Sequence, residues 1–267
     1  MYDVGSVPWG TFLSGFRWNQ GEHVSLIGPT GHGKTTLAGH LLEHPPIGRF
    51  HPHSQHPYWR TLKQVPPESV ELPRPYVVIF ANKRRDETAE RFLQRGYVRL
   101  AQWVDLRPCR RQDPCHDGVY LPRRVLWPKS GQLGKTSSQR AVFERALNRI
   151  AEEEGWTLYV DDAVYVLDNE MLRLRPEYRD SLYRLRASGI TIISGIQRPA
   201  SVPRELYSQV RHIFFWHTND EADLDRIQGV GGLSGKRLRG TVMRLQFHET
   251  LYVNTLTEEM VRTQTPS

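Results

Sequence analysis

Residues 22–42 read EHVSLIGPTGHGKTTLAGHLL: an apolar run, a glycine-rich segment and a second apolar run. The run at 22–27 predicts a buried strand, and the spacing over 34–42 predicts a helix. Between them, GPTGHGKTT at 28–36 matches G-x-x-x-x-G-K-[ST] at every fixed position. The motif therefore stands between a strand and a helix, which is the setting that a phosphate-binding loop requires.

The chemistry of this loop follows from its residue types. Glycines let the backbone curl so that its N–H groups converge on phosphate oxygens, and the helix beyond adds a partial positive charge. Lys34 is expected to reach the β- and γ-phosphates of ATP, and Thr35 to bind Mg²⁺. The competing interpretation is a glycine-rich turn that only joins a strand to a helix. The residues expected to contact nucleotide are Gly28, Thr30, Gly31, His32, Gly33, Lys34, Thr35 and Thr36.

The rest of the chain alternates between strands and helices. Apolar runs predict strands at 76–81, 158–160, 190–194 and 212–216, and periodic runs predict helices at 86–95, 138–154, 176–187 and 220–227. Apolar β-branched runs separated by helices favour a parallel sheet that is buried on both faces. We therefore expect one α/β domain over 1–267, with a hairpin at 241–254 added to the sheet edge.

Two segments are too long for ordinary connections, which usually run about 4–6 residues. Residues 43–75 contain eight prolines and four histidines, and residues 107–136 contain scattered prolines and both cysteines. We interpret both segments as insertions in the domain.

Acidic and polar residues follow two of the predicted strands. TLYVDD at 157–162 ends in two acids, of which Asp161 is expected to hold Mg²⁺ and Asp162 to orient or deprotonate the attacking water. The competing interpretation is an acid that caps the next helix. SGIQRP at 194–199 places Gln197 at a strand tip, where it can sense the γ-phosphate or simply face solvent.

Basic residues suggest two further roles. In RLRASGI at 184–190, Arg184 and Arg186 end a helix, where they either favour the helix dipole or act as an arginine finger for a neighbouring subunit. In GVGGLSGKRLRG at 229–240, a glycine-rich loop carries Lys236, Arg237 and Arg239. That loop is a candidate for touching a DNA backbone, and the alternative is a solvated loop before the hairpin.

Composition narrows the class of protein. The 267 residues carry 36 basic and 29 acidic side chains, a net charge of +7, and only six of the 36 are lysine, which leaves 30 arginines. Arginine binds phosphate bidentately, and basic surfaces attract nucleic acid, although the base composition of a genome also enriches arginine. No run of about 18 apolar residues and no secretory leader is present, and two cysteines make no disulfide framework, so a cytoplasmic protein is expected.

Together these segments resemble the FtsK–HerA superfamily of P-loop ATPases. The matching blocks are GPTGHGKTT at 28–36, LYVDD at 158–162, LRASGITIISGIQRPASVPRELYSQV at 185–210 and HIFFWHTNDEADLDRI at 212–227, about half of the chain. The third block is the most specific to the family.

The resemblance implies a RecA-like fold with a mostly parallel sheet flanked by helices, and it implies ATP and Mg²⁺ as cofactors. It also implies that Asp161 is the metal-site acid, Asp162 the catalytic acid and Gln197 the sensor. Arg186 is the best match to the arginine that acts across subunits, and Arg184 is the alternative. The family usually has glutamate where this chain has Asp162, so slow hydrolysis or a different catalytic acid stays open.

The family pumps DNA as rings, so we expect an ATP-driven translocase of double-stranded DNA, of the viral genome-packaging type, that assembles as a hexamer. A portal or membrane complex is the expected docking partner, and the host cytoplasm or a virion vertex the expected location. The alternatives are an ATPase that powers protein secretion or assembly without DNA, and a nucleotide-binding scaffold that hydrolyses weakly.

Overall fold

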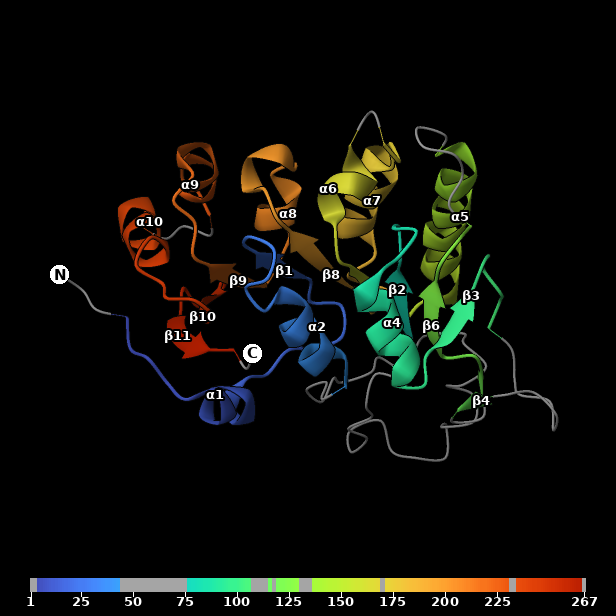
Figure 1. The fold of residues 1–267 in the computed structure, drawn as a ribbon, viewed down its shortest axis with the longest axis horizontal. Coiled ribbons are helices and arrows are strands. Elements are labelled where there is room, and N and C mark those ends of the chain that lie inside the picture. The colour runs from blue at the N-terminus through green and yellow to red at the C-terminus, as the bar shows by residue number, and fades with distance from the viewer. Residues whose placement is uncertain are drawn as a thin grey trace.

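A nine-stranded sheet forms the centre of the computed structural model, which describes residues 4–43, 76–106, 115–116, 119–129, 136–168, 171–230 and 234–265 (Figure 1). The seven strands from β9 to β3 run parallel, and β10 and β11 form an antiparallel hairpin at one edge. In sheet order the strands are β11 (Met260–Gln264), β10 (Glu249–Asn254), β9 (His212–Trp216), β1 (Val24–Ile27), β8 (Thr191–Ile196), β7 (Thr157–Val160), β2 (Val77–Phe80), β6 (Arg123–Leu126) and β3 (Val98–Leu100). A separate small hairpin joins β4 (Cys115–His116) to β5 (Val119–Tyr120).

Helices cover both faces of the sheet, as Figure 1 shows. One face carries α1 (Trp9–Gly15), α2 (Lys34–Glu43) and α4 (Glu87–Gln94). The other carries α5 (Ser137–Glu153), α6 (Ala163–Leu167), α7 (Arg175–Arg184), α8 (Glu205–Ser208), α9 (Glu221–Ile227) and α10 (Gly235–Val242), with a 3-10 turn at Pro199–Ser201. The covering of both faces explains why the strands have continuous apolar runs.

Two hydrophobic cores result, one on each face of the sheet. Successive strand residues point to opposite faces, so Val77 and Ile79 pack with α2 and α4, whereas Val78 and Phe80 pack with α5. The ring of Phe80 stacks on Phe143 of α5, with their centroids 4.4 Å apart. Burial of each such side chain contributes about 1.5–3 kcal/mol, which makes these faces the main source of stability.

The carboxyl ends of β1, β7 and β8 meet at one edge of the sheet because the three are parallel neighbours. Ile27 of β1 lies opposite Ile196 of β8, so the loop after β1 and Gln197 start at adjacent points. The backbone carbonyl of Asp161, which follows β7, approaches Gly195 so closely that a Cβ at position 195 would collide with it. A glycine in β8 thus lets the two strand ends close together.

The predicted strands and helices within the parallel part are confirmed, with ends that differ by at most three residues. A C-terminal hairpin at the sheet edge is confirmed, but the bounds 241–254 are wrong: α10 occupies residues 235–242, and the two strands are β10 and β11, the second of which lies beyond residue 254. Five further elements were not predicted from the sequence, because they are short or lack a clear period: α1, α6, α8, β3 and β11.

The segment 107–136, interpreted as an insertion, contributes β6 to the sheet between β2 and β3. This strand was not predicted because its apolar run is interrupted by the charged residue Arg124. Its side chain is fully buried, donates to the carbonyl of Leu121 at 2.6 Å and lies over the rings of Trp103 and Trp156. Residues 44–75 of the other interpreted insertion lie outside the described residues.

No helix in the described ranges is long and apolar enough to cross a lipid bilayer.

Candidate functional site

A cavity of about 500 Å³ opens beside the glycine-rich loop at the carboxyl edge of the sheet. Its walls come from the loop itself, from the segment that follows β2, from the ends of β7 and β8, and from the turn that precedes β10. Of the residues predicted to act on nucleotide, it is lined by Thr30, Gly31, Gly33, Lys34, Thr35, Thr36, Asp161 and Gln197. Segments far apart in the sequence thus converge on one site.

The loop has the curled backbone that phosphate binding needs. Gly33 has a φ of +104°, a conformation that side-chain-bearing residues rarely adopt. A Cβ at Gly33 would also lie 2.7 Å from Oγ1 of Thr265, which packs against the loop from the end of β11. Lys34 then begins α2, so the N–H groups of the loop and of the first helical turn face the same cavity.

Lys34 is the buried cation of the site. Its Nζ donates hydrogen bonds to the carbonyls of Gly28 at 2.6 Å and of Pro29 at 2.7 Å. Burial lowers the pKa of Lys34 to about 8, although the negative charges of Asp161 and Asp162 oppose this shift. An anion in the cavity would stabilise the charged ammonium and reverse the shift.

Asp161 connects three parts of the chain. Its Oδ1 accepts from Oγ1 of Thr35 at 3.1 Å and from the hydroxyl of Tyr159, and its Oδ2 accepts from Oγ1 of Thr88 at 3.1 Å. Burial and the adjacent carboxylate raise the pKa of Tyr159 well above its usual value, so the phenol stays protonated and donates. Nζ of Lys83 lies 4.0 Å from Oδ2.

This donor set fits a hard divalent cation. Mg²⁺ prefers oxygen ligands, and it is commonly held by one or two protein oxygens together with substrate phosphates and water. The hydroxyl of Thr35 and the carboxylate of Asp161 are such oxygens, and both face the cavity that the loop lines.

Asp162 is placed as a helix cap. Its side chain accepts from the backbone N–H of Tyr165 at 3.3 Å, at the N-terminus of α6. This is the alternative that the sequence left open, and Asp162 is not among the residues that line the cavity. It is nevertheless close enough for its charge to act on Lys34. Its catalytic role stays a prediction.

Arg184 and Arg186 lie away from this cavity, near the amino ends of the parallel strands. The backbone carbonyl of Arg186 contacts Gly21, which precedes β1, whereas the loop follows β1. The four residues of β1, at about 3.3 Å each, separate the amino ends of the strands from the carboxyl ends. Arg184 is exposed and pairs with Asp180 at 2.9 Å. Neither arginine therefore serves the site of its own chain.

The segment predicted to be a basic loop is partly helical. Residues 235–242 form α10, and residues 231–233 lie outside the described part. Arg239 forms ion pairs with Glu221 and with Asp225 of α9. Lys236 and Arg237 are exposed on the first turn of α10. The prediction of a loop is wrong over residues 235–240, because these residues belong to α10, which packs Leu238 into the core.

Two walls of the cavity were not predicted from the sequence: the segment after β2 and the turn that holds His248. The segment NKRRDET at 82–88 follows β2 and supplies Lys83, Arg85, Asp86, Glu87 and Thr88. Asp86 caps α4 by accepting from the N–H of Ala89 at 3.0 Å, and burial raises its pKa. The sequence does contain a signal for this wall: a polar run directly follows an apolar strand. Such a run lies where the carboxyl ends of the other parallel strands meet.

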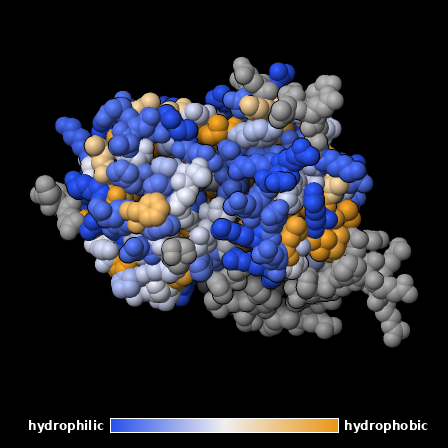
Figure 2. Space-filling model, in the orientation of Figure 1, coloured by the Kyte–Doolittle hydropathy of each residue, from blue (hydrophilic) through white to orange (hydrophobic). Residues whose placement is uncertain are grey.

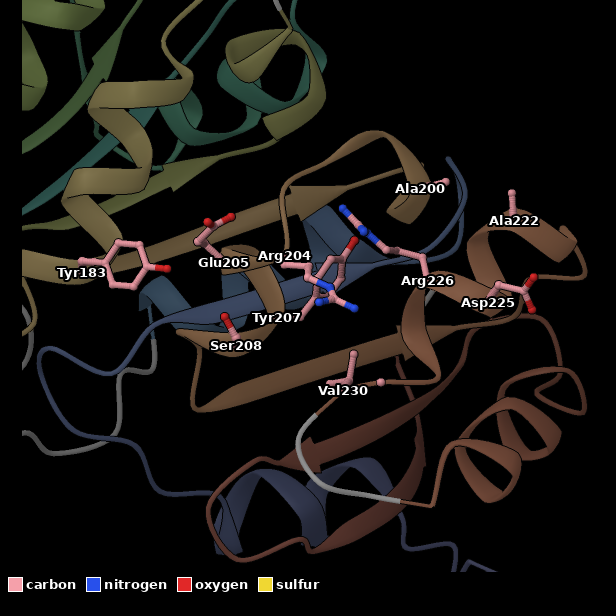
Figure 3. Close-up of a pocket in the computed structure, with 11 residues that line it drawn as sticks. Tyr183, Ala200, Arg204, Glu205, Tyr207, Ser208, Ala222, Asp225, Arg226 and Val230 are labelled. Atoms are coloured by element: carbon pink, nitrogen blue, oxygen red, sulfur yellow. The ribbon is translucent and has the colours of Figure 1, made fainter.

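A larger cavity of about 770 Å³ lies between α7, α8 and α9 (Figure 3). Arg204 and Arg226 point into it beside Tyr207, and Nη2 of Arg226 donates to the carbonyl of Val202 at 2.7 Å. Its lining includes none of the residues predicted for the nucleotide site. We therefore place the functional site in the smaller cavity.

The molecular surface offers few apolar groups on the face in Figure 2, where hydrophobic side chains form small separate groups on a mostly hydrophilic surface. Single exposed apolar residues are normal on a folded protein, so this face does not by itself indicate a docking surface.

Comparison with solved structures shows the same fold in three proteins. The first is the genome packaging NTPase B204 of Sulfolobus turreted icosahedral virus 2, with 14% identity and a TM-score of 0.57 over 94% of this chain and 100% of that chain. The second is the DNA-packaging ATPase B204 of Sulfolobus Turreted Icosahedral Virus, with 15% identity and a TM-score of 0.56 over 94% and 100%. The third is VirB4 of Thermoanaerobacter pseudethanolicus, with 13% identity and a TM-score of 0.58 over 92% and 89%.

At these identities the likeness establishes the fold alone, and it confirms the expected α/β fold with a mostly parallel sheet flanked by helices. No protein-family model matches the sequence. No curated protein matches it either.

Proposed function

We propose that this protein is a magnesium-dependent ATPase that moves double-stranded DNA as a ring of subunits, six by the family resemblance. The observation that carries the proposal is the cavity that joins Lys34, Asp161 and Gln197 from three neighbouring strand ends. A volume of about 500 Å³ falls within the range of about 300–1,000 Å³ of small-molecule sites.

The roles of the residues that line the cavity follow from their positions, and the roles of Asp162, Arg186 and Arg184 follow from the family resemblance. The loop N–H groups and the ammonium of Lys34 bind the phosphates, and Thr35 and Asp161 hold Mg²⁺, which neutralises phosphate charge when bound. Gln197, half-buried at the tip of β8, contacts the γ-phosphate end. Asp162 orients the attacking water, and Arg186 or Arg184 completes the site of a neighbouring subunit.

DNA as the moved substrate is supported by the solved neighbours and by charge. Two of the neighbours are described as packaging proteins, and this chain has a net charge of +7. Genome packaging is the preferred context, with a portal or membrane complex as the docking partner. Lys236 and Arg237 are the exposed cations proposed to meet the phosphate backbone, while Arg239 holds α10 to α9.

The test measures Mg–ATP turnover with and without linear duplex DNA at low salt, and repeats it at high salt. We expect DNA to raise turnover, and salt to remove the effect because phosphate contacts release counterions. Lys34→Ala is the control without turnover. Robust turnover that ignores DNA would favour an ATPase for protein secretion or assembly. Bound nucleotide with near-zero turnover in the assembled ring would favour a scaffold.

A further inference from the structure

The turn at residues 246–249 forms a wall of the cavity that the proposed roles do not use. His248 lines the cavity, and Phe247 beside it is 63% exposed. The Phe247 ring lies 5.1 Å from the ring of His32 in the glycine-rich loop and 4.1 Å from the ring of His248. A large exposed aromatic side chain therefore stands at the rim of an otherwise polar pocket.

The turn is held in place by several hydrogen bonds. Gln246 and Glu249 form two hydrogen bonds with each other. The backbone N–H of Glu249 donates to the carbonyl of Gln246, and the backbone N–H of Gln246 donates to Oε2 of Glu249, both at 3.0 Å. The carbonyl of His248 accepts from both the N–H and the Oγ1 of Thr265, at 2.9 and 2.8 Å. A side chain on such a turn is pre-organised, so little entropy is lost when it binds a ligand.

The strand order places the acids and the 246–249 turn on opposite sides of the cavity. Asp161 and Gln197 follow β7 and β8, on one side of β1. The 246–249 turn leads into β10, which pairs with β9 on the other side of β1, and Thr250 lies opposite Trp216 at the carboxyl end of β9. A triphosphate along the loop, with its reacting end at the acids, therefore extends its other end toward Phe247.

We propose that Phe247 is the nucleobase platform of this site: its ring stacks on the base of a bound nucleoside triphosphate, with His248 as the adjoining wall. The inference rests on the proposed nucleotide function. An aromatic ring offers no donor to a phosphate, but it stacks on the π-face of any base. The platform is thus tolerant of base identity and specific for nucleosides over bare polyphosphate.

The experiment compares the affinity of Mg–ATP with that of Mg–tripolyphosphate, which has the phosphates and no base. Phe247→Ala should weaken ATP binding about tenfold and leave tripolyphosphate binding unchanged. Phe247→Trp should retain the affinity for ATP. Leu256→Ala is the matched control, because Leu256 is 66% exposed at the far turn of the same hairpin.

The outcomes separate this inference from the proposed function. Unchanged ATP affinity in Phe247→Ala, or an equal loss for both ligands, would overturn the platform. Unchanged ATP affinity with altered self-association would do so as well, and would place Phe247 in a subunit contact. If the wild-type protein binds neither ligand, or if Lys34→Ala binds both normally, the nucleotide function itself fails.

Discussion

The hydroxyl of Thr35 donates a hydrogen bond to Oδ1 of Asp161 across 3.1 Å, although 126 positions of sequence separate the two residues. The contact joins the helix after the glycine-rich loop to the end of β7. It also brings together the two oxygen ligands that we assign to Mg²⁺.

Asp161→Asn tests that assignment. An amide cannot match the charge of a carboxylate toward Mg²⁺, so the Mg²⁺ concentration needed for half-maximal turnover should rise about 10- to 100-fold. ATP binding with Mg²⁺ chelated should change much less. A Mg²⁺ titration of turnover measures the effect, and Thr88→Ser, which keeps the second hydroxyl partner of Asp161, serves as the control. An unaltered Mg²⁺ requirement would remove Asp161 from the metal site.

Asp162→Asn separates capping from chemistry. Asparagine caps helices about as well as aspartate, so the free energy of unfolding should change by less than about 0.5 kcal/mol. Turnover should fall by about 10²- to 10⁴-fold if the carboxylate acts as a base. Denaturant unfolding and steady-state turnover provide the two readouts. Wild-type turnover in this variant would leave Asp162 as the cap of α6 alone and turn attention to Asp86 or Glu87.

The affinity for ATP should fall as pH rises through about 8, since burial lowers the pKa of Lys34 to that value in the free protein. Below this pH the ammonium is charged and pairs with phosphate; above it, binding must first recover a proton. Calorimetric titrations between pH 7.5 and 9.5 measure the slope. In Lys34→Arg the guanidinium stays charged, so a slope that persists there would assign the effect to another group.

Mixing experiments test the arginine that we assign to a neighbouring site. At constant total protein, adding Arg186→Ala subunits should reduce turnover more steeply than dilution, because each variant subunit disables its neighbour's site. Arg184→Ala, which breaks only an exposed pair with Asp180, should follow dilution. Steep loss with Arg184→Ala alone would move the finger to that residue. Proportional loss for both variants would contradict a shared site.

Acid should destabilise the fold through His23. Nδ1 of His23 accepts from the N–H of Ile192 at 3.1 Å, so Nε2 carries the proton that faces the carbonyl of Leu182. Burial lowers the pKa of His23 to about 4, with a smaller effect from the charge of Arg186.

The unfolded chain protonates this histidine near pH 6.5, whereas the folded chain resists protonation to about pH 4. Stability should therefore fall between those values, by up to about 3 kcal/mol. Denaturant unfolding over this range should show a smaller slope with pH in His23→Gln. If the free energy of unfolding changes equally with pH in both proteins, protonation of His23 does not cause the loss of stability in acid.

The sequence determined the elements whose signals are local. The glycine-rich loop is a contiguous motif, and the strands at 76–81 and 212–216 are unbroken apolar runs, so the fold class and the position of Lys34 followed directly. The acids after β7 and the glutamine after β8 could also be placed, because parallel strands bring their carboxyl ends to one edge.

Only the tertiary structure decided what depends on contacts between distant segments. The Thr88 hydroxyl reaches Asp161 because β2 lies beside β7, and Phe247 reaches His32 because β10 lies beside β9. Arg124 belongs to a core strand because two tryptophans, from elsewhere in the chain, cover its charge. Strand order, burial of a charge and the choice of capping partner are set by the packed sheet, and no local period in the sequence encodes them.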